Sequence, residues 1–135
     1  MEAKAKTILV VDDERVIREM LRRTLEAAGY AVTVAADGEE AMESIRGQRP
    51  DMILLDLVLP KKNGWEVCLE VRRRWASLKI PVIILTGTSM EQARQSKIGA
   101  DDYLSKPFQS EELKTRVAAL FQKFADEKKA EPPKP

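Results

Sequence analysis

The chain has 135 residues, of which 44% are apolar and 33% are charged, and its formal net charge is +1. A chain of this length buries about two-thirds of its surface on folding, which is enough for one hydrophobic core and too little for two. The composition excludes a disordered chain, and the balanced charge excludes a general electrostatic attraction to nucleic acids or membranes.

The chain contains no histidine and a single cysteine, Cys68. The lack of histidine excludes histidine acid–base catalysis, histidine metal ligands and a histidine phosphocarrier. One thiol forms neither an internal disulfide nor a thiolate metal site. The first apolar run, Ile8–Val11, is too short for a signal peptide or a membrane span and ends at two aspartates. We therefore expect a cytoplasmic protein that does not enter the membrane.

Short apolar runs, most of them rich in β-branched residues, predict five strands. The first, third and fourth runs show no alternation, as expected for strands that are covered on both faces. The second and fifth are shorter or more polar, which is typical of edge strands. In chain order the runs are Ile8–Val11, Ala31–Ala35, Met52–Leu55, Val82–Leu85 and Tyr103–Leu104.

Helical patterns lie between and after these strands. The first carries one apolar stripe and ends at Gly29, and the second begins at a capping box of Asp37 and Glu40. The third spans Gly64–Trp75, the fourth is a mostly polar segment, Met90–Ile98, and the last begins at Ser110 and keeps its stripe to Phe124. The stripe of the first helix consists of Val16, Ile17, Met20, Leu21 and Leu25. In the third helix, the run Arg72-Arg73-Arg74 is expected to face solvent.

The alternation of strand and helix, repeated five times, predicts an α/β three-layer sandwich with a parallel sheet, helices on both faces and right-handed crossovers. We expect one domain over residues 1–124. Residues 125–135 lack apolar periodicity and predict a charged, proline-rich tail or the start of a linker.

Polar residues gather where the predicted strands end. Asp12 and Asp13 follow the first strand, Asp56 follows the third, Thr86-Gly87 follows the fourth and Lys106 follows the fifth. The carboxyl ends of parallel strands meet at one edge of the sheet, so these groups are expected to converge. A single aspartate after a strand is most often a turn residue or a helix cap, and only the joint pattern indicates a site.

Three crowded carboxylates repel one another by about 1 kcal/mol per pair at 4 Å even in water, so the cluster indicates a bound cation. Oxygen ligands at a partly open site suit Mg²⁺, which is commonly held together with phosphate oxygens. Lys106 and Thr86 offer a positive charge and a hydroxyl donor to a phosphoryl group. Gly87 leaves room for a phosphoryl oxygen to approach the backbone.

With these residues in place, the chain resembles the receiver domains of two-component response regulators over about Thr7–Phe124. Together and in order the matching motifs are highly specific, although each alone is weak. They are Ile8–Glu14, Pro50–Asp56, Pro60 with Asn63-Gly64, Ile80–Thr86 and Gly99–Phe108. The resemblance implies a flavodoxin-like, doubly wound fold with strand order 2-1-3-4-5.

The resemblance also implies a role for each site residue. Asp56 accepts the phosphoryl group, while Asp12, Asp13, Asp56 and the carbonyl of Val58 hold Mg²⁺, Asp12 mainly through a bound water. Lys106, Thr86 and Gly87 contact the phosphoryl oxygens. Thr86 and Tyr103 form the switch that changes the face built from the fourth helix, fifth strand and fifth helix. The bond before Pro107 is expected to be cis, and Gly64 is expected to be structural.

Two features depart from the pattern of this family. Thr86 and Tyr103 are 17 positions apart, about two fewer than the family pattern leads us to expect. Val58 and Thr88 stand two residues after Asp56 and Thr86, where longer polar groups are common. We expect from this that few side chains can orient an attacking water, and that the phosphoryl group is long-lived.

The leading functional hypothesis is a signalling switch rather than an enzyme, with only self-phosphorylation and autodephosphorylation activity. Its expected partners are a sensor histidine kinase or phosphotransfer protein and a downstream protein or output domain, without direct nucleic-acid binding. A monomer and a phosphorylation-dependent dimer are both compatible. The alternatives are a Mg²⁺-dependent aspartyl-phosphate phosphohydrolase, distinguished by repeated turnover of phosphate esters, and a degenerate receiver that serves only as a docking module.

Overall fold

The computed structural model describes residues 5–57, 59, 64–74, 80–87 and 100–130, with the backbone alone at 86 and 128–130. These residues form strands β1 (Thr7–Val11), β2 (Ala31–Ala35), β3 (Met52–Asp56), β4 (Val82–Thr86) and β5 (Asp102–Ser105). The helices are α1 (Arg15–Ala27), α2 (Gly38–Gly47), α3 (Gly64–Arg74) and α5 (Ser110–Ala130). The predicted helix at Met90–Ile98 lies outside the described residues.

The strands form a single parallel sheet in the order β2-β1-β3-β4-β5. This order and the parallel pairing confirm the predicted fold class, and β2 and β5 are the two edges. In register, Val11 of β1 pairs with Leu55 of β3, and Thr86 of β4 pairs with Ser105 of β5. The carboxyl ends of β1 and β3 therefore lie side by side at the center of the sheet.

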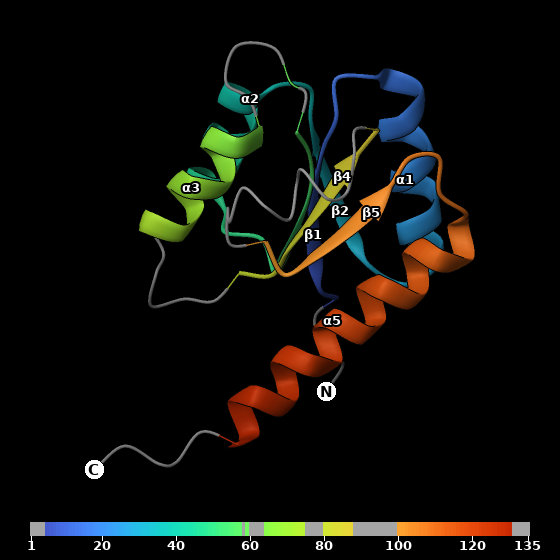
Figure 1. Ribbon diagram of the computed structural model, residues 1–135, viewed down its shortest axis with the longest axis vertical. Coiled ribbons are helices and arrows are strands. Elements are labelled where there is room, and N and C mark those ends of the chain that lie inside the picture. The colour runs from blue at the N-terminus through green and yellow to red at the C-terminus, as the bar shows by residue number, and fades with distance from the viewer. Residues whose placement is uncertain (1–4, 58, 60–63, 75–79, 88–99, 131–135) are drawn as a thin grey trace.

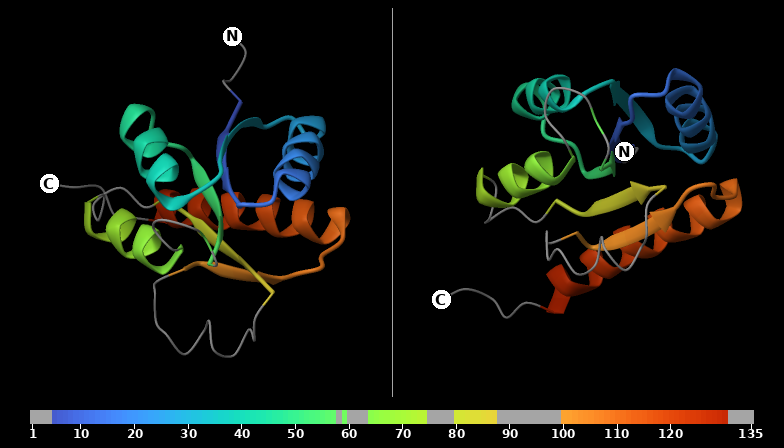
Figure 2. Two further views of the ribbon diagram at one scale, coloured as in Figure 1. Left: turned by 90° about the horizontal axis from the view of Figure 1, so that it is seen from above. Right: turned by 45° about the horizontal axis from the view of Figure 1, so that its top comes forward.

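Helices cover both faces of the sheet (Figures 1 and 2). One core cluster joins α2 and α3 to one face, and a second joins α1 and α5 to the other. Alternate residues of each inner strand enter opposite clusters, as the two-residue period of a strand requires. In β3, for example, Ile53 and Leu55 belong to the first cluster, and Met52 and Leu54 to the second.

Two predicted helix boundaries have a visible physical cause. The Asp37 carboxylate accepts a hydrogen bond of 2.8 Å from the backbone N–H of Glu40, which satisfies one of the free donors at the start of α2. At the end of α1, Gly29 adopts a φ of 100°, a left-handed conformation that favours glycine.

The apolar stripe of α1 is narrower than predicted. Leu21 and Leu25 are buried and Ile17 is partly buried, but Val16 and Met20 are 80% and 40% exposed. Ile17, Leu21 and Leu25 are spaced four residues apart and share one face of the helix. Val16 and Met20 lie one residue earlier in each turn, about 100° away around the axis, where neither the sheet nor α5 covers them.

Helix α5 continues to Ala130, beyond the predicted end at Phe124. The segment from Ala125 to Ala130 is charged but contains good helix formers, and the first proline follows only at Pro132. The segment predicted as a charged, proline-rich tail or linker start thus begins as helix, with exposed side chains at 125–127. Within the described part of the chain, no helix combines the length and apolar character that crossing a membrane requires.

Candidate functional site

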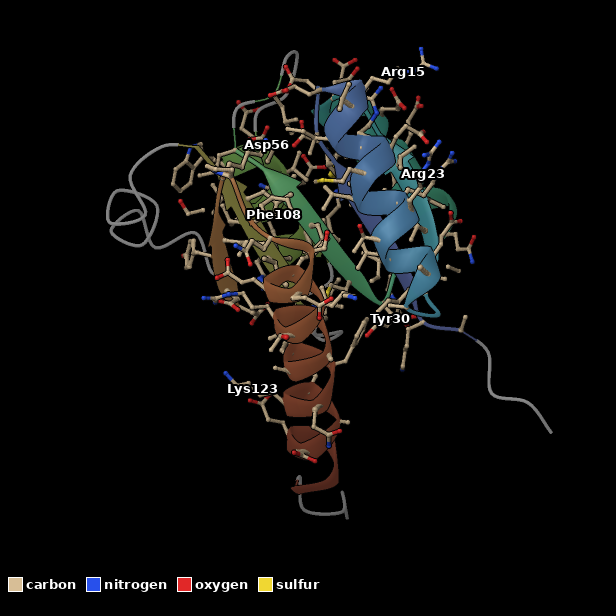
Figure 3. All side chains as sticks on the ribbon, turned by 90° about the vertical axis from the view of Figure 1, so that its right-hand side faces the viewer. Arg15, Arg23, Tyr30, Asp56, Phe108 and Lys123 are labelled. Carbon is tan, nitrogen blue, oxygen red and sulfur yellow. The ribbon has the colours of Figure 1, made fainter. Side chains whose placement is uncertain are left out.

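The aspartates of the site are placed by two neighbouring strands. Asp56 is the last residue of β3, and Asp12 directly follows β1, whose Val11 pairs with Leu55. Figure 3 shows Asp56 near the upper ends of the strands, far from Tyr30 near their lower ends. The parallel arrangement therefore carries both acids to the same end of adjacent strands, as the sequence predicted.

Asp12, Asp13 and Asp56 each offer a carboxylate oxygen, and these three oxygens lie within 4.8 Å of one another. Asp12 is fully buried and Asp56 nearly so, at 0% and 5% exposure, whereas Asp13 is exposed. Two buried acids and one exposed acid form a concentration of negative charge that opens to solvent on one side. The structure thus brings together the three side chains that the sequence predicted to converge.

Every polar group of Asp12 is held by a defined partner. Its Oδ1 accepts from the backbone N–H of Glu14 at 2.9 Å, and its own N–H donates to the Ala35 carbonyl at 3.2 Å. Its carbonyl oxygen accepts from Nη1 of Arg18 at 2.8 Å, and its Oδ2 accepts from Nζ of Lys106 at 2.7 Å. This buried carboxylate is therefore fixed in one orientation.

Lys106 joins the two buried acids. Its Nζ donates to Oδ2 of Asp12 at 2.7 Å and to Oδ2 of Asp56 at 3.0 Å, and its side chain is 17% exposed. Burial alone would lower the pKa of Lys106, but hydrogen bonds and attraction to the two carboxylates outweigh burial and raise that pKa above its ordinary value. Lys106 is therefore a cation at neutral pH, and its charge partly offsets the cluster.

The strand ends place the other predicted site residues nearby. Thr86 ends β4 opposite Ser105 in the backbone register, which puts it beside the residue that precedes Lys106. Gly87 is exposed, and a Cβ built on it would meet no atom within 4 Å. The Lys106–Pro107 peptide bond is cis. Tyr103 pairs with Ile84 in the register and packs, partly buried, against the α2–α3 core cluster.

Several predicted residues are not described structurally. Val58, whose carbonyl was predicted to hold Mg²⁺, and Thr88 lie outside the described residues. For Thr86 the backbone position alone is described, so its hydroxyl is not placed.

Gly64 begins α3 directly against the backbone of Asp56. Its N–H donates to the Leu57 carbonyl at 3.0 Å, and a Cβ built on it would lie 2.3 Å from the Asp56 carbonyl oxygen. Only a residue without a side chain allows this approach. Gly64 therefore sets how closely α3 packs behind the strand end that carries Asp56.

One prediction for α3 was wrong. Arg72 does not face solvent with its two neighbours: it donates to the Ile80 carbonyl at 2.7 Å and to Oδ2 of Asp101 at 2.5 Å. The same Asp101 oxygen accepts from the backbone N–H of Val82. Arg72 thus connects the last turn of α3 to the start of β4, at the end of the sheet opposite Asp56. Arg73 and Arg74 are exposed, as predicted.

Two polar contacts were not anticipated. Arg18 at the end of the first turn of α1 donates to the Asp12 carbonyl, and Arg116 of α5 binds both oxygens of Asp102 at 2.9 and 3.0 Å. The only sequence signal for Arg18 is a basic residue one helical turn inside the helix that follows the paired aspartates. Long side chains of this kind have too many possible partners for spacing alone to assign them.

Comparison with known proteins assigns the family. The profile described as "Response regulator receiver domain" matches residues 8–118. The chain belongs to the response regulator receiver domain family. It is thus a receiver domain of the kind found in two-component signalling, which confirms the resemblance drawn from the sequence motifs.

Curated relatives include the response regulator MprA of Mycobacterium avium and of Mycobacterium tuberculosis. Each is 44% identical to this chain over 124 residues, which is 92% of this chain and 54% of the relative. The receiver domain therefore spans about half the length of the curated relatives it matches.

Solved receiver structures match over almost their whole length. The chemotaxis protein CheY4 of Vibrio cholerae is 36% identical, with a TM-score of 0.79 over 86% of this chain and 98% of that chain. TrrA of Thermotoga maritima, solved in complex with Mg²⁺ and BeF, is 38% identical with a TM-score of 0.77, over 85% and 98% of the two chains. The receiver domain of the Pseudomonas aeruginosa sensor kinase PA1611, solved with magnesium in its active-site cleft, is 34% identical with a TM-score of 0.77, over 84% and 95%.

Proposed function

We propose that this receiver domain accepts a phosphoryl group on Asp56 in a Mg²⁺-dependent reaction and signals through the resulting change in charge. The observation that carries the proposal is the meeting of Asp12, Asp13 and Asp56 with Lys106 at one edge of the sheet. A stable core needs no such concentration of buried charge, because charges that lose water cost free energy unless they are paired.

The donor set fits Mg²⁺. Three carboxylate oxygens within 4.8 Å of one another, one of them on an exposed side chain, provide hard ligands and leave room for water. Bound Mg²⁺ supplies divalent charge that offsets the carboxylates and the phosphoryl oxygens. The magnesium-bound relatives TrrA and PA1611 support this assignment by similarity.

In the proposed reaction an oxygen of Asp56 attacks the phosphorus of the donor. A P–O bond to Asp56 forms while the P–N bond of a kinase or phosphotransfer phosphohistidine breaks, and the imidazole leaves with the bonding electron pair. With a small acyl phosphate, the P–O bond to the acyl group breaks instead. The aspartyl phosphate carries about −1.5 to −2 charge in place of the single negative charge of the carboxylate, and Lys106 is placed to stabilise it.

Signalling then requires that this charge alter a surface. We infer that Thr86 and Tyr103 carry the change from the strand end to the β5–α5 face, because β4 and β5 pair directly between them. A downstream protein or an output domain would recognise that face. Val58 and Thr88 stand where longer polar side chains are common in this family. Because few side chains are then expected to orient an attacking water, we expect the phosphoryl group to be long-lived.

The test is intact-protein mass spectrometry after incubation with acetyl phosphate, with and without Mg²⁺. The wild-type chain should gain one phosphoryl group only with Mg²⁺, and Asp56→Asn should gain none. Asp126→Asn, which changes an exposed aspartate of α5, is the matched control and should label like wild type. Labelling of Asp56→Asn would refute the assignment, and steady hydrolysis of many equivalents of a phosphate ester would favour a phosphohydrolase.

A further inference from the structure

Arg18 is the one described side chain of α1 that reaches the acidic cluster through an assigned hydrogen bond. It is half-buried, and its Nη1 donates to the carbonyl oxygen of Asp12 at 2.8 Å. This bond does not touch a carboxylate. It fixes the peptide plane that connects Asp12 to Asp13.

The peptide plane matters because the two acids differ in how they are held. Asp12 is secured at its N–H and at both carboxylate oxygens by Ala35, Glu14 and Lys106. Asp13 is exposed, and its position depends on the backbone that precedes it. Since a peptide unit is planar, a fixed Asp12 carbonyl also fixes the N and Cα of Asp13, and with them the direction in which its side chain leaves the backbone.

We propose that Arg18 is a positioning residue for the cation site: by holding the Asp12 carbonyl, it keeps the Asp13 carboxylate within reach of Asp56. This inference rests on the proposed Mg²⁺ function of the cluster. Groups that orient metal ligands without touching the metal typically change metal affinity by 10–100-fold when they are removed.

A simple charge effect predicts the opposite sign. A guanidinium near the cluster repels a divalent cation, so removing its charge without any positional effect would tighten Mg²⁺ binding. If Arg18 instead orients the Asp12–Asp13 peptide, its removal weakens Mg²⁺ binding despite the lost repulsion. The direction of the change therefore separates the two roles.

The test is calorimetric titration of the whole chain with MgCl₂, in wild type, Arg18→Met, Arg18→Gln and Arg23→Met. Methionine and glutamine are good helix formers that do not reach the carbonyl, so either variant that keeps the wild-type circular dichroism spectrum decides the question. Arg23→Met removes the same charge from an exposed position five residues nearer the carboxyl end of α1 (Figure 3 labels Arg23) and serves as the matched control.

We expect the Arg18 variants to raise the Kd for Mg²⁺ by about tenfold, and Arg23→Met to leave it unchanged or slightly lower. An unchanged or lower Kd in the Arg18 variants would overturn the inference. A fall in their thermal stability without a rise in Kd would overturn it as well. Wild-type protein that binds no Mg²⁺ would instead refute the proposed function itself. The two failures are therefore distinguishable.

Discussion

The α-carbon of Gly64 packs against the backbone carbonyl of Asp56, so closely that a Cβ at this position would lie 2.3 Å from that oxygen and 2.7 Å from the Cα of Leu57. Both neighbouring atoms belong to the backbone and cannot rotate away. We expect Gly64→Ala to lower the free energy of unfolding by about 3 kcal/mol, the upper part of the range for overpacking, and to slow phosphorylation of Asp56. Urea unfolding and acetyl phosphate labelling measure the two effects.

Gly47 provides the control for this substitution. It ends α2, and a Cβ built on it meets no atom within 4 Å. Gly47→Ala should therefore be neutral or raise the free energy of unfolding by up to about 1 kcal/mol, the difference in helix propensity. Equal effects of the two substitutions would contradict the importance of the Gly64–Asp56 approach.

Removal of the Lys106 ammonium should expose the repulsion between the acids it joins. Lys106→Met leaves the buried carboxylates of Asp12 and Asp56 without their shared cation. We expect the free energy of unfolding at pH 7 to fall by about 3 kcal/mol, as when one partner of a buried ion pair is lost. Mg²⁺ should restore part of the loss, so the stabilisation by Mg²⁺ should be larger in the variant than in wild type.

Lys114→Met is the matched control, because Lys114 pairs with Glu111 on the exposed surface of α5 at 2.8 Å. Such a pair contributes less than about 1 kcal/mol. Urea unfolding of both variants with and without Mg²⁺ gives the comparison. A Lys106 variant as stable as wild type without metal would show that the acids do not need the ammonium.

The contact of Arg72 with Asp101 and Ile80 makes the first arginine of the triplet a structural residue. Arg72→Met removes donors from two acceptors, one of which also binds the Val82 N–H. We expect a loss of about 2 kcal/mol in the free energy of unfolding, because hydrogen bonds to charged groups contribute more than neutral ones. Arg73→Met, at an exposed neighbouring position, should change the free energy of unfolding by less than about 0.5 kcal/mol. Equal losses in the two variants would contradict the structural role of Arg72.

Cys68 should be inert in the folded protein. Burial raises the pKa of the thiol from 9.0 to about 11, since it outweighs the lowering effect of the Arg72 charge, and the nearby Asp101 adds to the rise. At pH 8 we therefore expect slow reaction with a thiol reagent that becomes fast in urea, since the thiolate is the reactive form. Rapid labelling of the native chain would contradict the burial of this side chain.

The raised pKa of Cys68 also predicts how the free energy of unfolding changes at alkaline pH. Because the folded state holds the Cys68 proton more tightly than the unfolded state, this stabilisation is complete below pH 9 and is lost as the pH rises toward 11. The raised pKa of Lys106 acts in the same direction above pH 10.5. The free energy of unfolding should fall over this range, and Cys68→Ala should reduce the slope.

Much of the fold was predictable because it depends on local patterns. Continuous apolar runs marked the strands, and the glycine at 29 and the cap at Asp37 marked helix ends that the structure reproduces. The convergence of Asp12, Asp13 and Asp56 followed from parallel topology, because the ends of adjacent parallel strands must meet.

Features that depend on tertiary distances were not predictable in this way. Periodicity gives the center of a buried helix face but not its width, which is why Val16 and Met20 were misplaced. Arg72 finds its partner Asp101 across 29 positions of sequence, and Arg18 meets a backbone carbonyl, an acceptor that every residue offers. The continued α5 shows that a helix can extend past its apolar stripe when no residue stops it.

The ammonium of Lys106 joins carboxylates that lie 94 and 50 positions earlier in the chain. Pairings across such spans form only after most of the intervening chain is ordered. A copy still emerging from the ribosome, or one whose last strand has detached, holds the acids without their counter-charge. If the site has the proposed role, only a fully folded domain can therefore be phosphorylated. Misfolded copies would not transmit a signal.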